Sequence, residues 1–227
     1  PSNQAEINQI VVFLHGYGAD GNDLITLSNY FSKNLPNTAF FSPNAPETTP
    51  MGFGRQWLSL DGYDPGALKS NPQQMIDLLE SMYDAAETAS VPLNNYLDEL
   101  LENYKLQDKD LCLIGFSQGT MMAIHAGLRR KSTLSSIVGY SGALIGAKYL
   151  SRDIINDTPP ILLIHGIEDE VVPFASLAHI EQSFKQHSIN YTSHGISGLG
   201  HGINDEGMLL GRSFVEKNRI YEESKAK

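Results

Sequence analysis

The sequence predicts an α/β fold, with a mostly parallel central sheet and helices on both faces, in a single domain over residues 1–227. Three observations predict it. Short apolar runs recur along the chain, helical patterns alternate with them, and no internal repeat or low-complexity linker divides the sequence. Strands that alternate with helices form βαβ units, whose strands run parallel. A chain of 227 residues is also long enough to bury one sizeable core.

Continuous apolar runs predict strands that are buried on both faces. Four such runs cover residues 10–14, 111–114, 136–140 and 161–164. Residues 38–41 and 191–196 predict two further strands.

Apolar residues at helical spacing predict six helices. They cover residues 22–35, 72–89, 93–106, 117–130, 175–187 and 204–218. The second begins with Asn71 as N-cap and Pro72 at the first helical position, where these residue types are favoured. The fourth ends near Arg129 and Arg130, because a helix C-terminus favours positive charge.

Residues 43–66 fit neither pattern, because they hold four prolines and four glycines together with Met51, Phe53 and Trp57. Long loops without secondary structure are usually functional. The apolar side chains therefore predict a substrate-side loop that walls or covers a binding site. The alternative is a loop that packs its aromatic side chains into the core beside the sheet edge.

Charge and composition exclude several classes of function. The net charge of −10 argues against nucleic-acid binding, which needs a basic stripe, and gives no support to a strongly anionic membrane partner. The single cysteine, Cys112, permits no intrachain disulfide and lies in an apolar run, so we expect a core residue rather than a nucleophile. The sequence shows no signal peptide and no run long enough to span a bilayer. We therefore expect a cytoplasmic protein without stable membrane insertion.

The pentapeptide Gly115-Phe116-Ser117-Gln118-Gly119 is a G-x-S-x-G motif between a predicted buried strand and a predicted helix. This strand–turn–helix context is the one a nucleophile elbow requires. The two glycines let the strand and the helix approach closely while the serine is held in a strained turn. The alternative is a plain strand–helix turn that happens to carry a serine.

A nucleophilic serine needs a general base, and the base needs an acid that orients it. In hydrolases with this elbow, the three follow in the chain order serine, acid, histidine. Of seven histidines, His201 lies between glycines after the last predicted strand and before the last predicted helix. The acid should follow the strand at 161–164, where Glu168, Asp169 and Glu170 compete and spacing does not choose among them.

Ester hydrolysis also needs N–H donors for the oxyanion of the tetrahedral intermediate. One is the backbone N–H of the residue after the nucleophile, which is Gln118. The second should come from the glycine-rich turn after the first buried strand, where Tyr17 is the candidate.

Four segments in this order resemble the phospholipase/carboxylesterase family of α/β-hydrolases, which includes the acyl-protein thioesterases. They are residues 14–21, 115–119, 165–173 and 200–202. The resemblance covers nearly the whole chain and implies that Asp169 is the catalytic acid and that Tyr17 and Gln118 form the oxyanion hole. It also places Arg55, Gln56 and Trp57 in the family's substrate-side loop. One departure is that only nine residues precede the first buried strand, where many relatives carry an additional β segment.

We therefore expect a serine hydrolase that cleaves carboxylic esters of short to medium acyl chains through Ser117, His201 and Asp169, without metal or cofactor. Apolar side chains predicted to contact the acyl chain are Met51, Phe53, Trp57, Leu60, Val171, Val172 and Leu199, although core packing is the alternative for each. The alternatives for the whole protein are an acyl-protein thioesterase, a lysophospholipase, or a non-catalytic hydrolase fold that serves as a binding module. The exposed loop could support a homodimer or a transient lipid contact, and the sequence favours neither.

Overall fold

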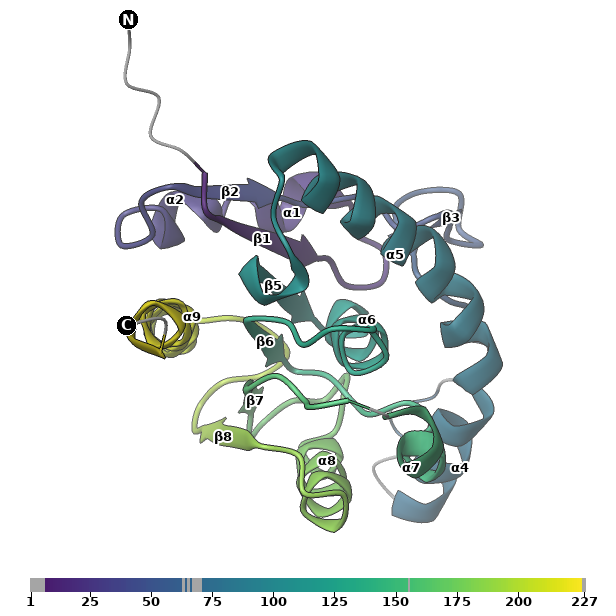
Figure 1. Cartoon of the computed structure of the whole chain (residues 1–227). Coiled ribbons are helices and arrows are strands. Elements are labelled where there is room, and N and C mark those ends of the chain that lie inside the picture. The colour runs from purple at the N-terminus through teal and green to yellow at the C-terminus, as the bar shows by residue number, and fades with distance from the viewer. Residues whose placement is uncertain (1–6, 63, 65, 67–70, 155, 226–227) are drawn as a thin grey trace, which may run out of the picture.

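The fold is built on a sheet of six parallel strands with helices on both faces (Figure 1), which confirms the predicted class. The computed structural model describes residues 7–62, 64, 66, 71–154 and 156–225. The strand order is β2-β1-β5-β6-β7-β8. The strands are β1 (Gln9–Leu14), β2 (Thr38–Phe41), β5 (Leu111–Phe116), β6 (Ser136–Tyr140), β7 (Ile161–Gly166) and β8 (Tyr191–Ile196). Residues 1–6, where an additional N-terminal β segment would fall, lie outside the described residues.

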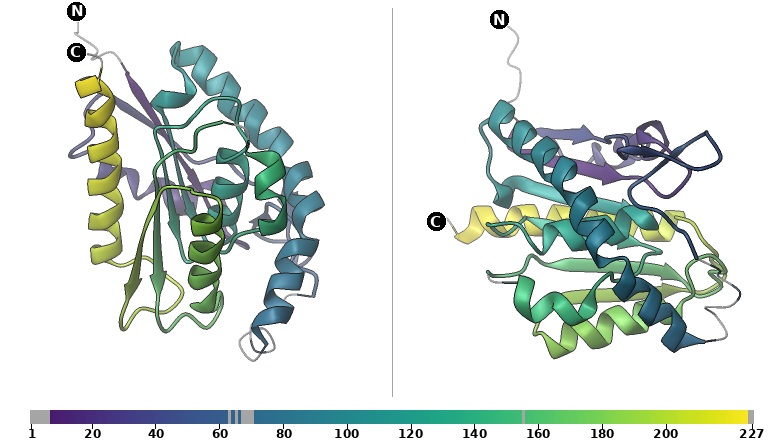
Figure 2. Two further views of the ribbon diagram at one scale, coloured as in Figure 1. Left: turned by 60° about the horizontal axis from the view of Figure 1, so that its bottom comes forward. Right: turned by 90° about the vertical axis from the view of Figure 1, so that its right-hand side faces the viewer.

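Two layers of helices cover the sheet, and Figure 2 shows α9 lying along one face with α4 to α8 on the other. On the first face, α1 (Gly21–Ile25), α2 (Ser28–Phe31) and α9 (Asp205–Lys225) bury Leu24, Phe31 and Val215 against the sheet. The opposite face carries α4 (Pro72–Ser81), α5 (Tyr83–Tyr104), α6 (Gln118–Gly127), α7 (Leu150–Asp153) and α8 (Ala175–Gln186). Two short 3₁₀ helices, Asp108–Asp110 and Ala147–Tyr149, precede β5 and α7.

The prediction of helices over 72–89 and 93–106 is wrong at their boundary. The break falls at Met82, and α5 runs without interruption through Pro92. A proline inside a helix costs a hydrogen bond. Here Pro92 lies on the exposed side, while Ala89 and Leu93 on either side of it belong to one buried face. Burial of that continuous face outweighs the lost bond.

The predicted helix over 22–35 is also wrong in extent, because α1 and α2 are two short helices separated at residues 26–27. The predicted loop at 43–66 contains a small hairpin that the sequence pattern did not predict. Its strands, β3 (Glu47–Thr48) and β4 (Arg55–Gln56), pair antiparallel.

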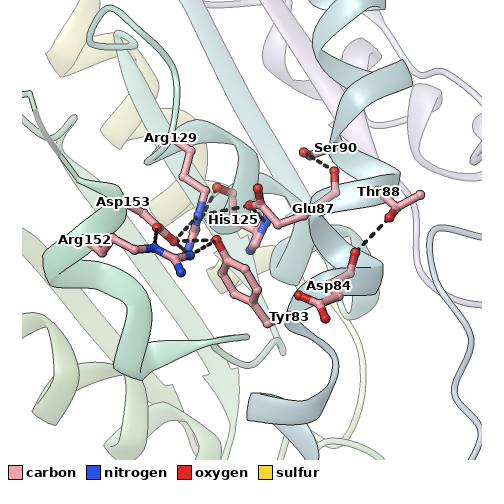
Figure 3. Close-up of polar contacts among 9 residues, drawn as sticks. All are labelled: Tyr83, Asp84, Glu87, Thr88, Ser90, His125, Arg129, Arg152 and Asp153. Carbon is pink, nitrogen blue, oxygen red and sulfur yellow. Dashed lines mark hydrogen bonds and ion pairs between the residues drawn. The ribbon is translucent and has the colours of Figure 1, made fainter.

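A polar network ties α5, α6 and α7 together behind the sheet (Figure 3). Asp153 accepts hydrogen bonds from the Tyr83 hydroxyl at 2.8 Å and from Arg129 Nε at 3.0 Å. The buried His125 ring contacts Glu87 Oε1 at 2.7 Å, and burial lowers the pKa of His125 to about 3. The ring is therefore neutral at physiological pH, and the network fixes the position of α6.

Candidate active site

Ser117 lies in a strained turn between β5 and α6. Its backbone has φ 53° and ψ −119°, a left-handed conformation that is costly for a residue with a side chain. The Ser117 N–H donates to Tyr140 O at 2.9 Å, which ties the turn to the neighbouring strand β6. The predicted strand, turn and helix around Ser117 are thus present.

The two motif glycines are needed for close packing around this turn. A β-carbon on Gly119 would overlap the Leu14 carbonyl at the end of β1, and one on Gly115 would overlap the backbone of Gly119 and Thr120. Only glycine lets β5, β1 and α6 approach this closely.

Asp169 and His201 lie together at the carboxyl edge of the sheet. His201 Nδ1 is 2.8 Å from Asp169 Oδ2, and the Asp169 carboxylate is fully buried. Its other oxygen, Oδ1, accepts the backbone N–H groups of Val171 and Val172, each at 2.9 Å. Of the three neighbouring carboxylates, Asp169 is buried and contacts His201, whereas Glu168 and Glu170 are exposed.

A second histidine, His165 at the end of β7, also faces Asp169. Its Nε2 is 2.9 Å from Val172 O and 3.4 Å from Asp169 Oδ2. Burial opposes ionisation of Asp169, but the contacts with His165 and His201 and the Val172 N–H outweigh it and hold the pKa of Asp169 well below its ordinary value. Asp169 is therefore a carboxylate at neutral pH.

Ser117 and His201 line one cavity of about 230 Å³. The cavity walls are formed by Gly16, Tyr17, Leu60, Phe116, Ser117, Gln118, Met121, Val171, Val172 and His201. The His201 ring also packs against Phe116, with ring centroids 4.8 Å apart. No hydrogen bond joins Ser117 to His201 within the described residues. Such contacts are often long in ligand-free hydrolases and tighten when substrate binds.

The two predicted oxyanion donors lie in the turn after β1 and at the start of α6. Gln118 is the first residue of α6, so its N–H has no carbonyl partner within the helix. Tyr17 lies in the turn after β1, which is fixed because Gly18 N–H donates to Arg55 O at 2.9 Å and Ala19 N–H donates to Gly16 O at 3.3 Å. Both Tyr17 and Gln118 line the cavity.

The predicted substrate-contact residues separate into two groups. Leu60, Val171 and Val172 line the cavity. Met51 and Phe53 lie at the exposed tip of the β3–β4 hairpin, with 62% and 64% of their surface accessible. The Trp57 side chain turns inward from the loop and is buried in the core. Leu199 packs against the core on the α9 face. These last four residues do not line the cavity, and their role in substrate binding stays a prediction.

The sequence analysis did not predict three residues that contribute to this site. Phe116 and Met121 line the cavity, and His165 contacts the carboxylate. A signal existed for the first two, because Phe116 precedes the serine and Met121 follows it by one helical turn.

The described residues hold no cluster of three or more His, Cys, Asp or Glu side chains suited to a metal ion.

Residues 2–219 match the family described as Phospholipase/Carboxylesterase. The chain belongs to the phospholipase/carboxylesterase family. The match spans both the serine turn and the Asp169–His201 pair, as the resemblance had implied. The family is one of carboxylesterases and thioesterases, and the protein is a hydrolase of this type.

Curated family members are similar over most of the chain. Acyl-protein thioesterase 1 of Schizosaccharomyces pombe is 27% identical over 222 residues, which covers 91% of this chain and 89% of the relative. Acyl-protein thioesterase 1 homolog 1 of Dictyostelium discoideum is 26% identical over 210 residues, with the same coverage of 91% and 89%.

Solved structures show the same fold. Esterase PE8 is 33% identical and superposes with a TM-score of 0.81 over 96% of this chain and 95% of its own. Arabidopsis thaliana SOBER1 is 22% identical with a TM-score of 0.78, covering 92% of this chain and 98% of its own. Within the described residues of the present chain, every helix is too short or too polar to cross a membrane.

Proposed function

We propose that the protein hydrolyses carboxylic esters of short to medium acyl chains through a Ser117–His201–Asp169 triad. The observation that carries the proposal is the Asp169–His201 contact of 2.8 Å at a cavity whose wall includes a serine in a strained elbow. The family membership supports ester chemistry, and the triad assigns this chemistry to named atoms.

Each residue has a separate role in the proposed reaction. His201 Nε2 accepts the Ser117 hydroxyl proton as the oxygen attacks the acyl carbon, and it later delivers the proton to the leaving group. Asp169 holds Nδ1 protonated and stabilises the imidazolium that forms. The N–H groups of Tyr17 and Gln118 bind the oxyanion, and such a donor is worth about 3–4 kcal/mol of transition-state stabilisation. Water activated by the same His201 then releases the acyl group from Ser117.

The size and lining of the cavity support the proposal of a short to medium acyl chain. Its volume is about 230 Å³, and its apolar walls include Leu60, Met121 and Val172. An acyl chain in this cavity is removed from water, which favours binding in proportion to the apolar area buried.

A fluorophosphonate probe tests the triad directly, because it reacts with an activated serine. We expect labelling of the wild type and none of Ser117→Ala. Equal labelling of the two proteins, or no labelling of the wild type, would refute the mechanism and would favour a non-catalytic binding module.

A substrate panel tests the acyl preference. We expect catalytic efficiency on p-nitrophenyl esters to be greatest for acyl chains of about four to eight carbons, because a small apolar cavity encloses such chains best. Higher efficiency on a palmitoylated peptide would favour the acyl-protein thioesterase alternative, since relatives carry that name. Higher efficiency on lysophosphatidylcholine would favour a lysophospholipase.

Two further experiments test the expected location and the oligomeric state. Expression with a fluorescent fusion tests the cytoplasmic location, and light scattering tests whether a homodimer forms.

A further inference from the structure

The side-chain amide of Gln118 holds the substrate-side loop. Its Oε1 accepts the Trp57 N–H at 2.7 Å, and its Nε2 donates to Leu58 O at 2.8 Å. Both bonds are buried, and they join residues about sixty positions apart in the chain. One amide therefore satisfies a backbone donor and a backbone acceptor of adjacent loop residues. This pairing fixes the loop in both position and direction.

Two further bonds connect the same loop to the turn after β1. The Trp57 indole N–H donates to His15 O at 3.0 Å, and the His15 ring accepts the Ala45 N–H at Nε2, also at 3.0 Å. His15 is fully buried, and burial lowers its pKa, so the ring stays neutral and Nε2 remains an acceptor. We define the loop latch as the side chains of His15, Trp57 and Gln118. The latch ties the loop to both segments that carry the proposed oxyanion donors.

The latch also determines where one wall of the cavity lies. Leu60 lines the cavity and follows Leu58, the residue held by Gln118 Nε2, by only two positions. Leu60 faces a cavity whose other walls include Val171 and Val172 of the Asp169 loop. A loop released from the latch would let Leu60 retreat and would enlarge the acyl site.

We propose that the loop latch sets the acyl-chain selectivity of the enzyme, with the Gln118 side chain as a positioning residue. This rests on the proposed function for its substrate class. The role differs from that of the Gln118 backbone N–H, because the side chain acts through the position of Leu60 rather than on the reacting atoms.

Gln118→Met tests the latch, because methionine has similar length and no amide. It removes both hydrogen bonds to the loop while the backbone N–H at this position remains. Trp57 is the only tryptophan in the sequence and is 3% exposed, so its fluorescence reports on the latch alone. In the variant we expect a red-shifted emission and stronger quenching by acrylamide.

The kinetic readout is the ratio of kcat/KM for p-nitrophenyl octanoate to that for the butyrate. A displaced Leu60 holds the short acyl chain less closely, so we expect a fall of about tenfold in kcat/KM for the butyrate. The octanoate should lose less, because a retreating Leu60 gives a longer chain more room. The ratio therefore rises.

Thr120→Val is the matched control, because it removes a buried hydrogen bond from the same helix. Thr120 Oγ1 donates to Tyr140 O at 2.8 Å, in the sheet rather than in the loop. We expect wild-type acrylamide quenching and a wild-type ester ratio in this control. His15→Phe is a second latch variant, which releases Ala45 while it keeps an aromatic ring beside Trp57; it should change both readouts in the same direction as Gln118→Met.

Two outcomes would overturn the proposal. In the first, Trp57 quenching in both folded latch variants equals that of the control. In the second, Trp57 becomes exposed while the ester ratio stays at the wild-type value. The fluorescence measurement needs no activity, and fluorophosphonate labelling reports separately on Ser117, so a failure of the latch is distinguishable from a failure of the triad.

Discussion

Replacement of Asp169 by asparagine tests the most closely defined contact in the proposed site. Oδ1 of Asp169 accepts two backbone N–H groups, from Val171 and Val172, whereas Oδ2 faces His201 and His165. The asparagine oxygen is expected to stay toward the two backbone donors. Its NH₂ group then faces the histidines and becomes a donor to His201 Nδ1. That contact stabilises the His201 tautomer with the proton on Nε2, which cannot accept a proton from Ser117.

The replacement of the carboxylate by an amide predicts the size of the loss in kcat and in unfolding free energy. The wrong tautomer predicts a fall in kcat of roughly 10⁴-fold, the size seen when a triad aspartate becomes asparagine. His165 keeps its contact with Val172 O at 2.9 Å, and His201 regains one bond. The net loss is therefore about one hydrogen bond to a charged group, or about 1.5–3 kcal/mol of unfolding free energy.

The pH dependence gives the stability change a direction. The pKa of Asp169 is lower in the folded protein than in the unfolded chain, where an aspartate titrates at about 3.9. Its ionised form therefore stabilises the fold fully above that pH, and this contribution is lost as the pH falls through it toward the folded pKa. The stability difference between wild type and Asp169→Asn should be complete at neutral pH and should shrink below about pH 4.

Urea unfolding at several pH values and hydrolysis of p-nitrophenyl butyrate measure the two effects. Glu168→Gln and Glu170→Gln are matched controls, because they make the same chemical change at exposed positions on either side of Asp169. We expect both controls to keep nearly wild-type activity. An Asp169→Asn protein with activity within tenfold of wild type, or a Glu168→Gln protein with the larger defect, would refute the assignment of the acid.

Three further predictions concern residues outside the triad. Gly119→Ala should abolish activity or folding, because its β-carbon would overlap the last carbonyl of β1, and activity together with circular dichroism would reveal either result. Asp153→Asn should lower the unfolding free energy by about 2 kcal/mol, since it weakens the bonds from Tyr83 and Arg129 in the α5–α6–α7 network (Figure 3), while fluorophosphonate labelling persists. Cys112 should resist a thiol reagent in the folded protein and react only after urea is added, because burial raises the pKa of its thiol to about 12.

The sequence predicted the sheet well because central strands such as β1, β5 and β7 are nearly continuous runs of buried apolar side chains. The boundaries of β1, β5 and β7 differ from the predicted ones by only one or two residues. Helix boundaries were harder. The predicted helices ended at Ala89 and began again at Leu93, yet the exposed position of Pro92 on α5 leaves the buried face of one continuous helix intact. Local propensity was outweighed by the packing of α5 against α6 and the core, which no local pattern encodes.

The side-chain contacts of the site were predictable only where a motif carried them. Ser117 and His201 lie in glycine-rich segments that mark strained or tight turns, so their positions could be recognised. The bonds of Gln118 to Trp57 and Leu58 join distant segments and leave no periodic signal. These bonds could be identified only from the fold, which places the loop against the start of α6.

The choice among Glu168, Asp169 and Glu170 could nevertheless have been argued from local chemistry. An aspartate side chain is short enough to accept the backbone N–H groups two and three residues ahead, which builds a turn. Asp169 Oδ1 does this with Val171 and Val172. The turn then orients the second oxygen toward His201, so one carboxylate both shapes the loop and positions the imidazole. A glutamate has one more methylene and loses this local fit. Local turn chemistry therefore favours the same residue that we propose as the orienting acid.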